Sequence, residues 1–219
     1  MELRVRRDRD LDEVLPLRSL AVALALLALP AWSGHQSDPL ASRSLGHADA
    51  PVVVFEMSDF QCPYCREFAL TVFPTLDREF VQTGKVRFVY VNFPLTAIHR
   101  HAVAAAAVAM CAARQNKFWP VHDLLFQRQE RWAGAEQPGP YLLALADSAG
   151  ADPAELAQCV TSRATEPEIH ADAARAARSG AHSTPTFYIE GGLLEGAAPV
   201  AAFRRVLDSI YRSKTAHGR

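Results

Sequence analysis

The sequence predicts an α/β fold in which a long helical insertion separates two groups of strands. A run of β-branched and aromatic residues at 52–55 is followed by a helical pattern and a second strand pattern, the order of a parallel crossover unit. The region of about 97–180 contains no strand pattern, and two short strand patterns come after it. With 219 residues and 49% hydrophobic content, the chain can bury one sizeable core.

The first part of the predicted domain is strand, helix, strand. Residues 52–55 are apolar without alternation, as expected of a strand covered on both faces. Residues 62–80 form a helix whose apolar side chains recur every four residues, with a kink expected at Pro74. Residues 85–93 then form a second strand that is buried on both faces.

The second part begins with four or five short helices, separated by breaks near residues 116, 134–140, 150–153 and 165–167. Strands at 186–190 and 193–195 follow, joined by a two-residue turn at Gly191-Gly192, and a helix at 199–211 ends the domain. The complete order is that of the thioredoxin topology, with a helical insertion between the second and third core strands.

Residues 1–33 are predicted to be a signal peptide or a membrane anchor. Residues 20–32 form an uncharged apolar run that follows Arg18, and small residues after it suit cleavage by a signal peptidase. Because both charge signs are mixed before this run, one hypothesis is that translation starts near Val14 or Leu15. Residues 34–49 are interpreted as a linker, and residues 50–219 as the thioredoxin-like domain.

The charge of the chain argues against two classes of partner. The formal net charge is -1 and the isoelectric point is about 6.7. Such a chain has no overall basic field that would attract nucleic acid or anionic lipid. Proteins that carry thiols or disulfides remain as candidate partners.

The motif Cys62-Pro63-Tyr64-Cys65 is the candidate reactive centre. A cysteine at the start of a helix is stabilised as a thiolate by free backbone N–H groups and by the helix dipole. We therefore predict Cys62 as the nucleophile and Cys65, one turn further on, as the resolving thiol. Pro63 and Tyr64 are expected to tune the reduction potential of the pair.

The same spacing also occurs in zinc sites, which need two further ligands at a short interval. Cys111 and Cys159 stand singly and far downstream, and His99 and His101 belong to another predicted element. Redox chemistry is therefore favoured over zinc binding, and neither a metal nor a cofactor is expected.

Two segments together resemble a known family. The first is residues 56–65, Glu-Met-Ser-Asp-Phe-Gln-Cys-Pro-Tyr-Cys, and the second is residues 183–187, Ser-Thr-Pro-Thr-Phe. The chain resembles the DsbA-like thiol:disulfide oxidoreductases from about residue 50 to the C-terminus, and in particular their Gram-positive and actinobacterial branch. This resemblance implies that the Thr184–Pro185 bond is cis and lies against the active-site pair, where the backbone of Thr184 pairs with the substrate.

Further roles follow from the same resemblance. Glu56 occupies the position of a buried acid that moves protons to and from the inner cysteine. Cys111 and Cys159 correspond to a pair that forms a structural disulfide, although two buried free thiols are an alternative. A histidine near the position of His99 is familiar in the branch, but the sequence does not indicate its role, and a capping or surface position is favoured.

The predicted function is thiol:disulfide exchange outside the cytoplasm, in the periplasm or cell envelope. The expected partners are exported proteins and a membrane protein that restores the redox state of the pair, and a monomer is expected. A disulfide donor is ranked first, a reductase second and an isomerase third. Against an isomerase stands the linker of about fifteen residues, in which no separate dimerisation domain fits. A copper(I) delivery module is the non-enzymatic alternative, which the three methionines support poorly.

Overall fold

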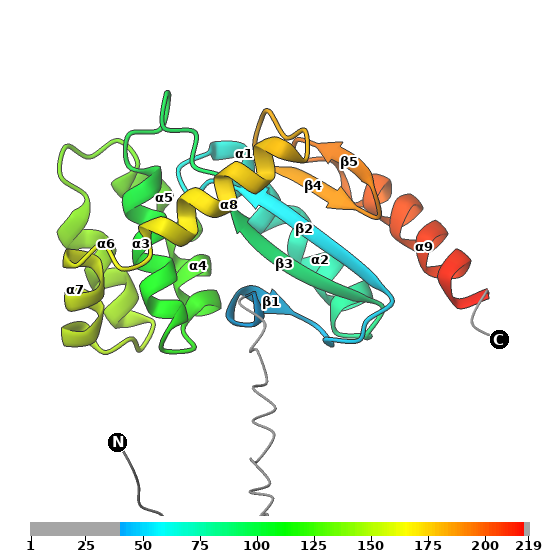
Figure 1. Ribbon diagram of the computed structural model, residues 1–219, viewed down its shortest axis with the longest axis horizontal. Coiled ribbons are helices and arrows are strands. Elements are labelled where there is room, and N and C mark those ends of the chain that lie inside the picture. The colour runs from blue at the N-terminus through cyan, green and yellow to red at the C-terminus, as the bar shows by residue number, and fades with distance from the viewer. Residues whose placement is uncertain (1–39, 217–219) are drawn as a thin grey trace, which may run out of the picture. The chain divides into compact units, whose positions relative to one another are not determined.

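The computed structural model describes residues 40–216 and contains a five-stranded mixed sheet (Figure 1). The strand order is β1-β3-β2-β4-β5, with only β2 and β3 parallel to each other. The bounds are β1 Ser44–Leu45, β2 Val52–Ser58, β3 Val86–Asn92, β4 Thr186–Ile189 and β5 Gly192–Glu195. The predicted α/β thioredoxin fold with a helical insertion between the second and third core strands is therefore confirmed.

A helical segment from residue 63 to residue 81 connects β2 to β3. It alternates between α-helix and π-helix, as α1 Pro63–Glu67, η2 Phe68–Val72, α2 Phe73–Leu76 and η3 Asp77–Val81. The expected irregularity at Pro74 lies where η2 passes into α2. Proline has no N–H to donate to the preceding turn, so the regular α pattern is interrupted there.

Residues 102–178 form six helices, one or two more than the sequence predicts. They are α3 Ala102–Ala113, α4 Phe118–Gln127, α5 Gln129–Trp132, α6 Gly139–Ser148, α7 Pro153–Thr161 and α8 Glu166–Arg178. All four predicted breaks are present. The additional break, at Arg128 between α4 and α5, involves neither glycine nor proline and so leaves no local signal in the sequence.

The predicted turn of the last hairpin lies one residue too far along the chain. The observed turn consists of Glu190 and Gly191, and both have positive φ angles, of 47° and 89°. A left-handed glutamate is unusual, which is why the sequence favours Gly191-Gly192 as the turn. The chain then ends in helix α9, Val200–Ala216.

Helices cover both faces of the sheet (Figure 1). On one face, the segment from α1 to η3 and helix α9 enclose an aromatic cluster that includes Phe68, Phe88, Phe187 and Phe203. On the other face, Met57 and Val91 pack against the end of α8. Different helices therefore cover the two faces of the sheet, and the cysteine pair lies on the face that packs against α1.

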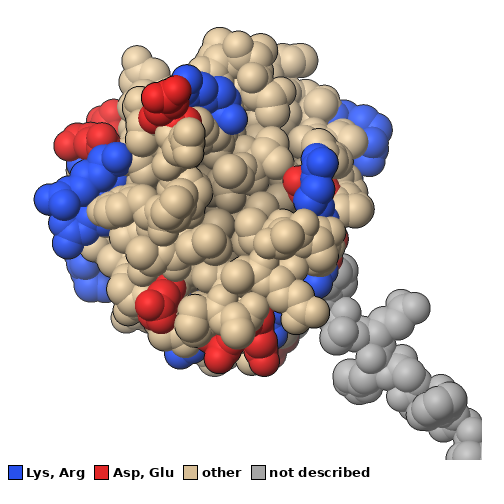
Figure 2. Space-filling model, turned by 90° about the vertical axis from the view of Figure 1, so that its left-hand side faces the viewer, with Lys and Arg blue, Asp and Glu red and all other residues tan. Residues whose placement is uncertain are grey.

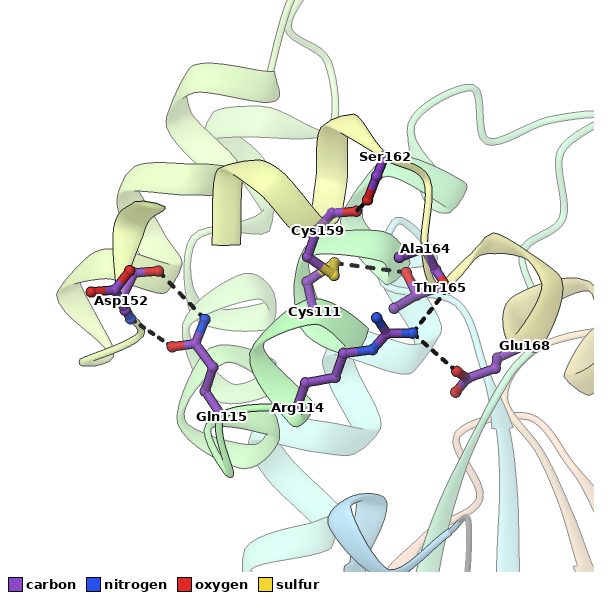
Figure 3. Close-up of a disulfide and its surroundings, with 9 residues drawn as sticks. All are labelled: Cys111, Arg114, Gln115, Asp152, Cys159, Ser162, Ala164, Thr165 and Glu168. Atoms are coloured by element: carbon purple, nitrogen blue, oxygen red, sulfur yellow. Dashed lines mark hydrogen bonds and ion pairs between the residues drawn. A yellow bond between two sulfur atoms is a disulfide. The ribbon is translucent and has the colours of Figure 1, made fainter. Parts of the chain in front are cut away.

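Cys111 of α3 and Cys159 of α7 form a disulfide within the insertion (Figure 3). Hydrogen bonds of neighbouring residues connect the end of α3 to the residues just before and just after α7. Gln115 accepts a hydrogen bond from the backbone N–H of Asp152 at 2.6 Å, and Arg114 donates to the carbonyl of Ala164 at 2.9 Å. These contacts and the disulfide fix α3 against the segment that runs from α7 into α8.

Figure 2 views the molecule from the side on which the insertion lies in Figure 1. Charged side chains of both signs are scattered toward the margin of this face, and uncharged residues occupy most of its centre. The face therefore carries no broad field of a single sign.

The linker predicted at 34–49 needs a correction in its described part, residues 40–49, because the fold begins before residue 50. Residues Ala41–Arg43 form a short 3₁₀-helix, η1, and Ser44–Leu45 pair with β3. Arg43 is buried and forms an ion pair with Asp172 of α8. A two-residue strand is too short for any alternation, and the long-range ion pair of a buried arginine cannot be read from its sequence neighbours.

The predicted signal peptide or anchor at 1–33 lies outside the described residues. Between residues 40 and 216, no helix combines the length and the hydrophobicity needed to cross a bilayer.

Candidate active site

The loop between β2 and α1 places Cys62 at the start of a helix. Cys62 is the N-cap residue of α1, with an extended backbone (φ -71°, ψ 126°), and Pro63 follows in the first turn. Asp59 shapes the loop, because its carboxylate accepts the N–H of Gln61 at 2.7 Å and its carbonyl accepts the N–H of Cys62 at 3.0 Å. Tyr64 is 61% exposed at the surface of the motif.

The surroundings of Cys62 favour its thiolate. Its pKa is lowered to about 6, mainly by a hydrogen bond from the Cys65 thiol and to a smaller extent by the backbone N–H groups of Cys65 and Tyr64, against the opposing effect of burial. The hydroxyl of Thr184 contributes in the same direction.

Cys65 has the opposite character. It is fully buried, and burial is the main reason why its pKa lies well above that of an ordinary thiol. The neighbouring Cys62 and Glu56 raise it further when they are charged. At neutral pH the reduced pair therefore contains one thiolate and one thiol, the arrangement that a dithiol exchanger needs.

Thr184 and Pro185 lie beside the outer cysteine, at the start of β4. The peptide bond between them is cis, and in its thiol form Cys62 donates a hydrogen bond through Sγ to the carbonyl of Thr184 at 3.3 Å. Thr184 is 122 positions away from Cys62 in the sequence. The antiparallel pairing of β4 with β2 brings the two residues to the site.

Glu56 lies on β2 below the cysteines and is 1% exposed. Its Oε1 has no hydrogen-bond partner within the described residues, and burial raises the pKa of the carboxyl to about 8. Glu56 is paired in the strand register with Tyr90, whose hydroxyl is also buried, and Ser58 lies two residues further along the same face. The carboxyl group is therefore protonated at neutral pH and lies in a buried polar cluster next to Cys65.

Sequence reasoning missed the roles of Asp59 and Gln129, two residues that hold the active-site loop through hydrogen bonds. The Oδ2 of Asp59 lies 2.8 Å from Nδ1 of His99 and accepts the N–H of Leu95, which gives His99 the structural role that the sequence left open. Gln129 of α5 donates to two carbonyl groups of the loop. Gln129 closely follows helix α4, whose aromatic and leucine side chains indicate core packing, and nothing in the nearby sequence marks an uncharged glutamine as part of the site.

Residues 40–216 contain no group of three or more histidine, cysteine, aspartate or glutamate side chains arranged to hold a metal ion. Cys62 and Cys65 are both free thiols, and Cys111 and Cys159 are already joined to each other.

The family model described as thioredoxin matches residues 40–209. The chain is similar to the probable disulfide bond formation protein D of Bacillus anthracis, with 32% identity over 69% of this chain and 70% of that protein. The crystal structure of oxidised BdbD from Bacillus subtilis superposes with a TM-score of 0.66, at 26% identity, over 78% of this chain and 92% of that one.

A further relative is much longer. The chain is 32% identical to the Na(+)/H(+) antiporter NhaA 3 of Salinispora tropica over 80% of its own residues, and it spans 26% of the length of that protein. The similarity therefore extends over one part of a larger protein.

Proposed function

Because this chain belongs to the DsbA-like thiol:disulfide oxidoreductases of the thioredoxin family, we propose that it donates disulfides to exported proteins through Cys62 and Cys65. The observation that carries the proposal is the opposite perturbation of the two thiols. The pKa of Cys62 is lowered to about 6, whereas burial raises that of Cys65. A thiolate of low pKa stabilises the reduced pair, and a pair whose reduced form is stable is a strong oxidant.

The reaction proceeds in two exchanges. A client thiolate attacks Sγ of Cys62 in the oxidised pair, the bond between Cys62 and Cys65 breaks, and Cys65 departs as a thiolate that takes up a proton. A second client thiolate then attacks the client sulfur of the mixed disulfide, and Cys62 departs as a thiolate. The client loses two electrons and gains a disulfide, while the pair gains two electrons.

Glu56 supplies the proton in the first exchange. Its pKa of about 8 keeps the buried carboxyl group protonated at neutral pH, so it holds a proton when the Cys65 thiolate forms beside it. Cys65 is buried and has a raised pKa, and its thiolate therefore binds a proton strongly. A carboxylic acid at this position lowers the cost of expelling a thiolate into a buried site.

The client chain is placed against Thr184. The carbonyl of this residue lies 3.3 Å from the sulfur that the client attacks, at the point where β4 begins. Backbone pairing at this position would hold the client cysteine near Cys62 without regard to the client's sequence. Pro185, which follows, has no N–H that could compete for the client backbone.

The reduction potential of the pair tests the direction of the reaction. The protein is equilibrated with glutathione buffers, and the reduced fraction is read from thiol alkylation. A disulfide donor is expected to have a potential above about -200 mV, whereas a value near or below about -250 mV would make the protein a reductase.

A second experiment tests the exchange itself. A Cys65→Ala variant keeps the nucleophile Cys62 but cannot resolve the mixed disulfide, so clients should remain attached and be released by a reductant. The matched control is Cys62→Ala, which should capture none. Failure of Cys65→Ala to capture any client while Cys62 reacts with an alkylating agent would count against the exchange mechanism.

We place this activity outside the cytoplasm, because an apolar run with an export-type boundary occupies residues 20–32. At that location, we assign reoxidation of the pair to a membrane protein. A C-terminal tag on the full chain tests the location by its accessibility to protease in intact cells or spheroplasts. A tag protected until the membrane is lysed would refute it.

A further inference from the structure

A buried amide connects the helical insertion to the backbone of the active-site loop. Gln129 is the first residue of α5 and is 4% exposed. Its Nε2 donates to the carbonyl of Phe60 at 2.7 Å and to the carbonyl of Cys62 at 2.9 Å. Both N–H groups of one side chain are thus directed to the loop that carries the nucleophile.

The carbonyl of Cys62 is a sensitive point of this loop. It also accepts the first hydrogen bond of α1, from the N–H of Arg66 at 3.2 Å. The direction of this carbonyl is set by the ψ angle of Cys62, which also sets where Sγ lies relative to the N–H groups of Tyr64 and Cys65. A side chain that holds the carbonyl therefore holds the sulfur over the start of the helix.

The helix that carries Gln129 is itself firmly held. Trp132 is fully buried and donates through Nε1 to the carbonyl of Leu125 at 2.9 Å. The backbone N–H of Ala133 donates to the carbonyl of Gln129 at 2.8 Å, and Gln61 of the loop donates to the carbonyl of Ala133 at 2.7 Å. The insertion and the loop therefore meet through two glutamines that point in opposite directions.

Packing alone does not require a glutamine at this position. An amide is costly to bury unless its hydrogen bonds are made, and a methionine would fill a similar volume at no such cost. Both N–H groups of the amide bind loop carbonyls, so the contact acts on loop conformation as well as on packing.

We propose that Gln129 is a positioning residue through which the helical insertion holds the active-site loop in the conformation that stabilises the Cys62 thiolate. The inference rests on the proposed function of the Cys62–Cys65 pair and adds a residue to it. In this view the insertion does more than enlarge the core, because it sets the reactivity of the nucleophile.

The test is a Gln129→Met variant of the full chain, with Gln127→Met as the matched control. Gln127 is the last residue of α4 and is exposed. Two quantities are measured, the pH at which half of Cys62 is a thiolate, from absorbance near 240 nm, and the equilibrium constant with glutathione. Loss of hydrogen bonds to the loop should shift the equilibrium constant about three- to tenfold toward the oxidised pair and raise the midpoint pH. The control should leave both unchanged.

Unfolding in urea separates positioning from general stability. If Gln129 acts on the thiolate, the variant loses more stability in the reduced form than in the oxidised form, because the equilibrium constant and the two stabilities form a closed cycle. Equal losses in both forms, with an unchanged equilibrium constant, would overturn the inference. If Gln129→Met does not fold, Gln129→Asn, which is too short to reach both carbonyls, takes its place with the same expected outcomes.

The inference and the proposed function fail in different ways. If the unmodified protein exchanges no disulfide with glutathione or clients, the proposed function is wrong whatever the variants do. If it exchanges disulfides normally and the Gln129 variants have the same equilibrium constant and midpoint pH, only the inference is wrong.

Discussion

Replacing Glu56 by glutamine is expected to stabilise the protein, and to stabilise it more at pH 7 than at pH 5. Glu56 is buried, and its pKa is raised from the ordinary value of 4.5 to about 8 because burial disfavours the carboxylate. Between these two pKa values the unfolded chain releases the proton while the folded protein keeps it. The contribution of Glu56 to stability is therefore largest below about pH 4.5 and is lost as the pH rises toward about 8.

The size of the effect follows from the distance between the pH and the pKa of the unfolded state. Each pH unit between the two pKa values costs about 1.4 kcal/mol. At pH 7 the glutamate therefore destabilises the fold by about 3 kcal/mol, and at pH 5 by about 1 kcal/mol, relative to a residue that cannot ionise. The Glu56→Gln substitution would remove this pH-dependent cost, whereas any change in neutral hydrogen bonding would be the same at both values.

The assay is urea unfolding of the reduced protein and of Glu56→Gln at pH 5, 6 and 7. The control is Glu67→Gln, an exposed residue of α1. We expect the difference in unfolding free energy between Glu56→Gln and the unmodified protein to grow by about 2 to 3 kcal/mol from pH 5 to pH 7. A difference that stays constant over this range would refute the burial argument for Glu56.

Three further predictions concern the cysteines and the insertion. In the Cys65→Ala variant, the pKa of Cys62 should rise above about 6, because the hydrogen bond from the Cys65 thiol is the largest effect that lowers this pKa. Absorbance near 240 nm as a function of pH measures the pKa of Cys62, and an unchanged midpoint would contradict the prediction. Replacing Cys111 and Cys159 together by serine should lower the unfolding free energy by about 2 to 4 kcal/mol, since the disulfide closes a separation of 48 residues. Denaturant unfolding under non-reducing conditions compares the double variant with the unmodified protein, and unfolding of both proteins with a reductant is the control. Asp172→Ala should cost about 3 to 5 kcal/mol because it leaves a buried arginine without its partner, whereas the exposed Asp147→Ala should cost less than about 0.5 kcal/mol; similar urea midpoints for the two variants would show that the buried ion pair is not needed.

The local pattern of the sequence was sufficient for most elements of the fold. The uninterrupted apolar strands, the four-residue spacing of the first helix and the Gly and Pro breaks of the insertion each reflect a short-range cause. Asp152, directly before Pro153, caps α7 and accepts the N–H of Glu155 at 2.8 Å. The errors came where the cause is not local, as in the linker residues that become β1 and the left-handed Glu190.

The sequence by itself also determined which residues carry the proposed chemistry. A helix start with Cys62 and Cys65 one turn apart is a local arrangement, and the Thr184-Pro185 dipeptide is recognisable from its neighbours. Only the tertiary structure decided how far the two thiols differ, because burial and hydrogen bonds depend on what surrounds each sulfur. The part played by Gln129 is of the same kind. It lies 67 residues from Cys62, and a hydrogen bond between an amide and a backbone carbonyl at that separation exists only once the chain has folded.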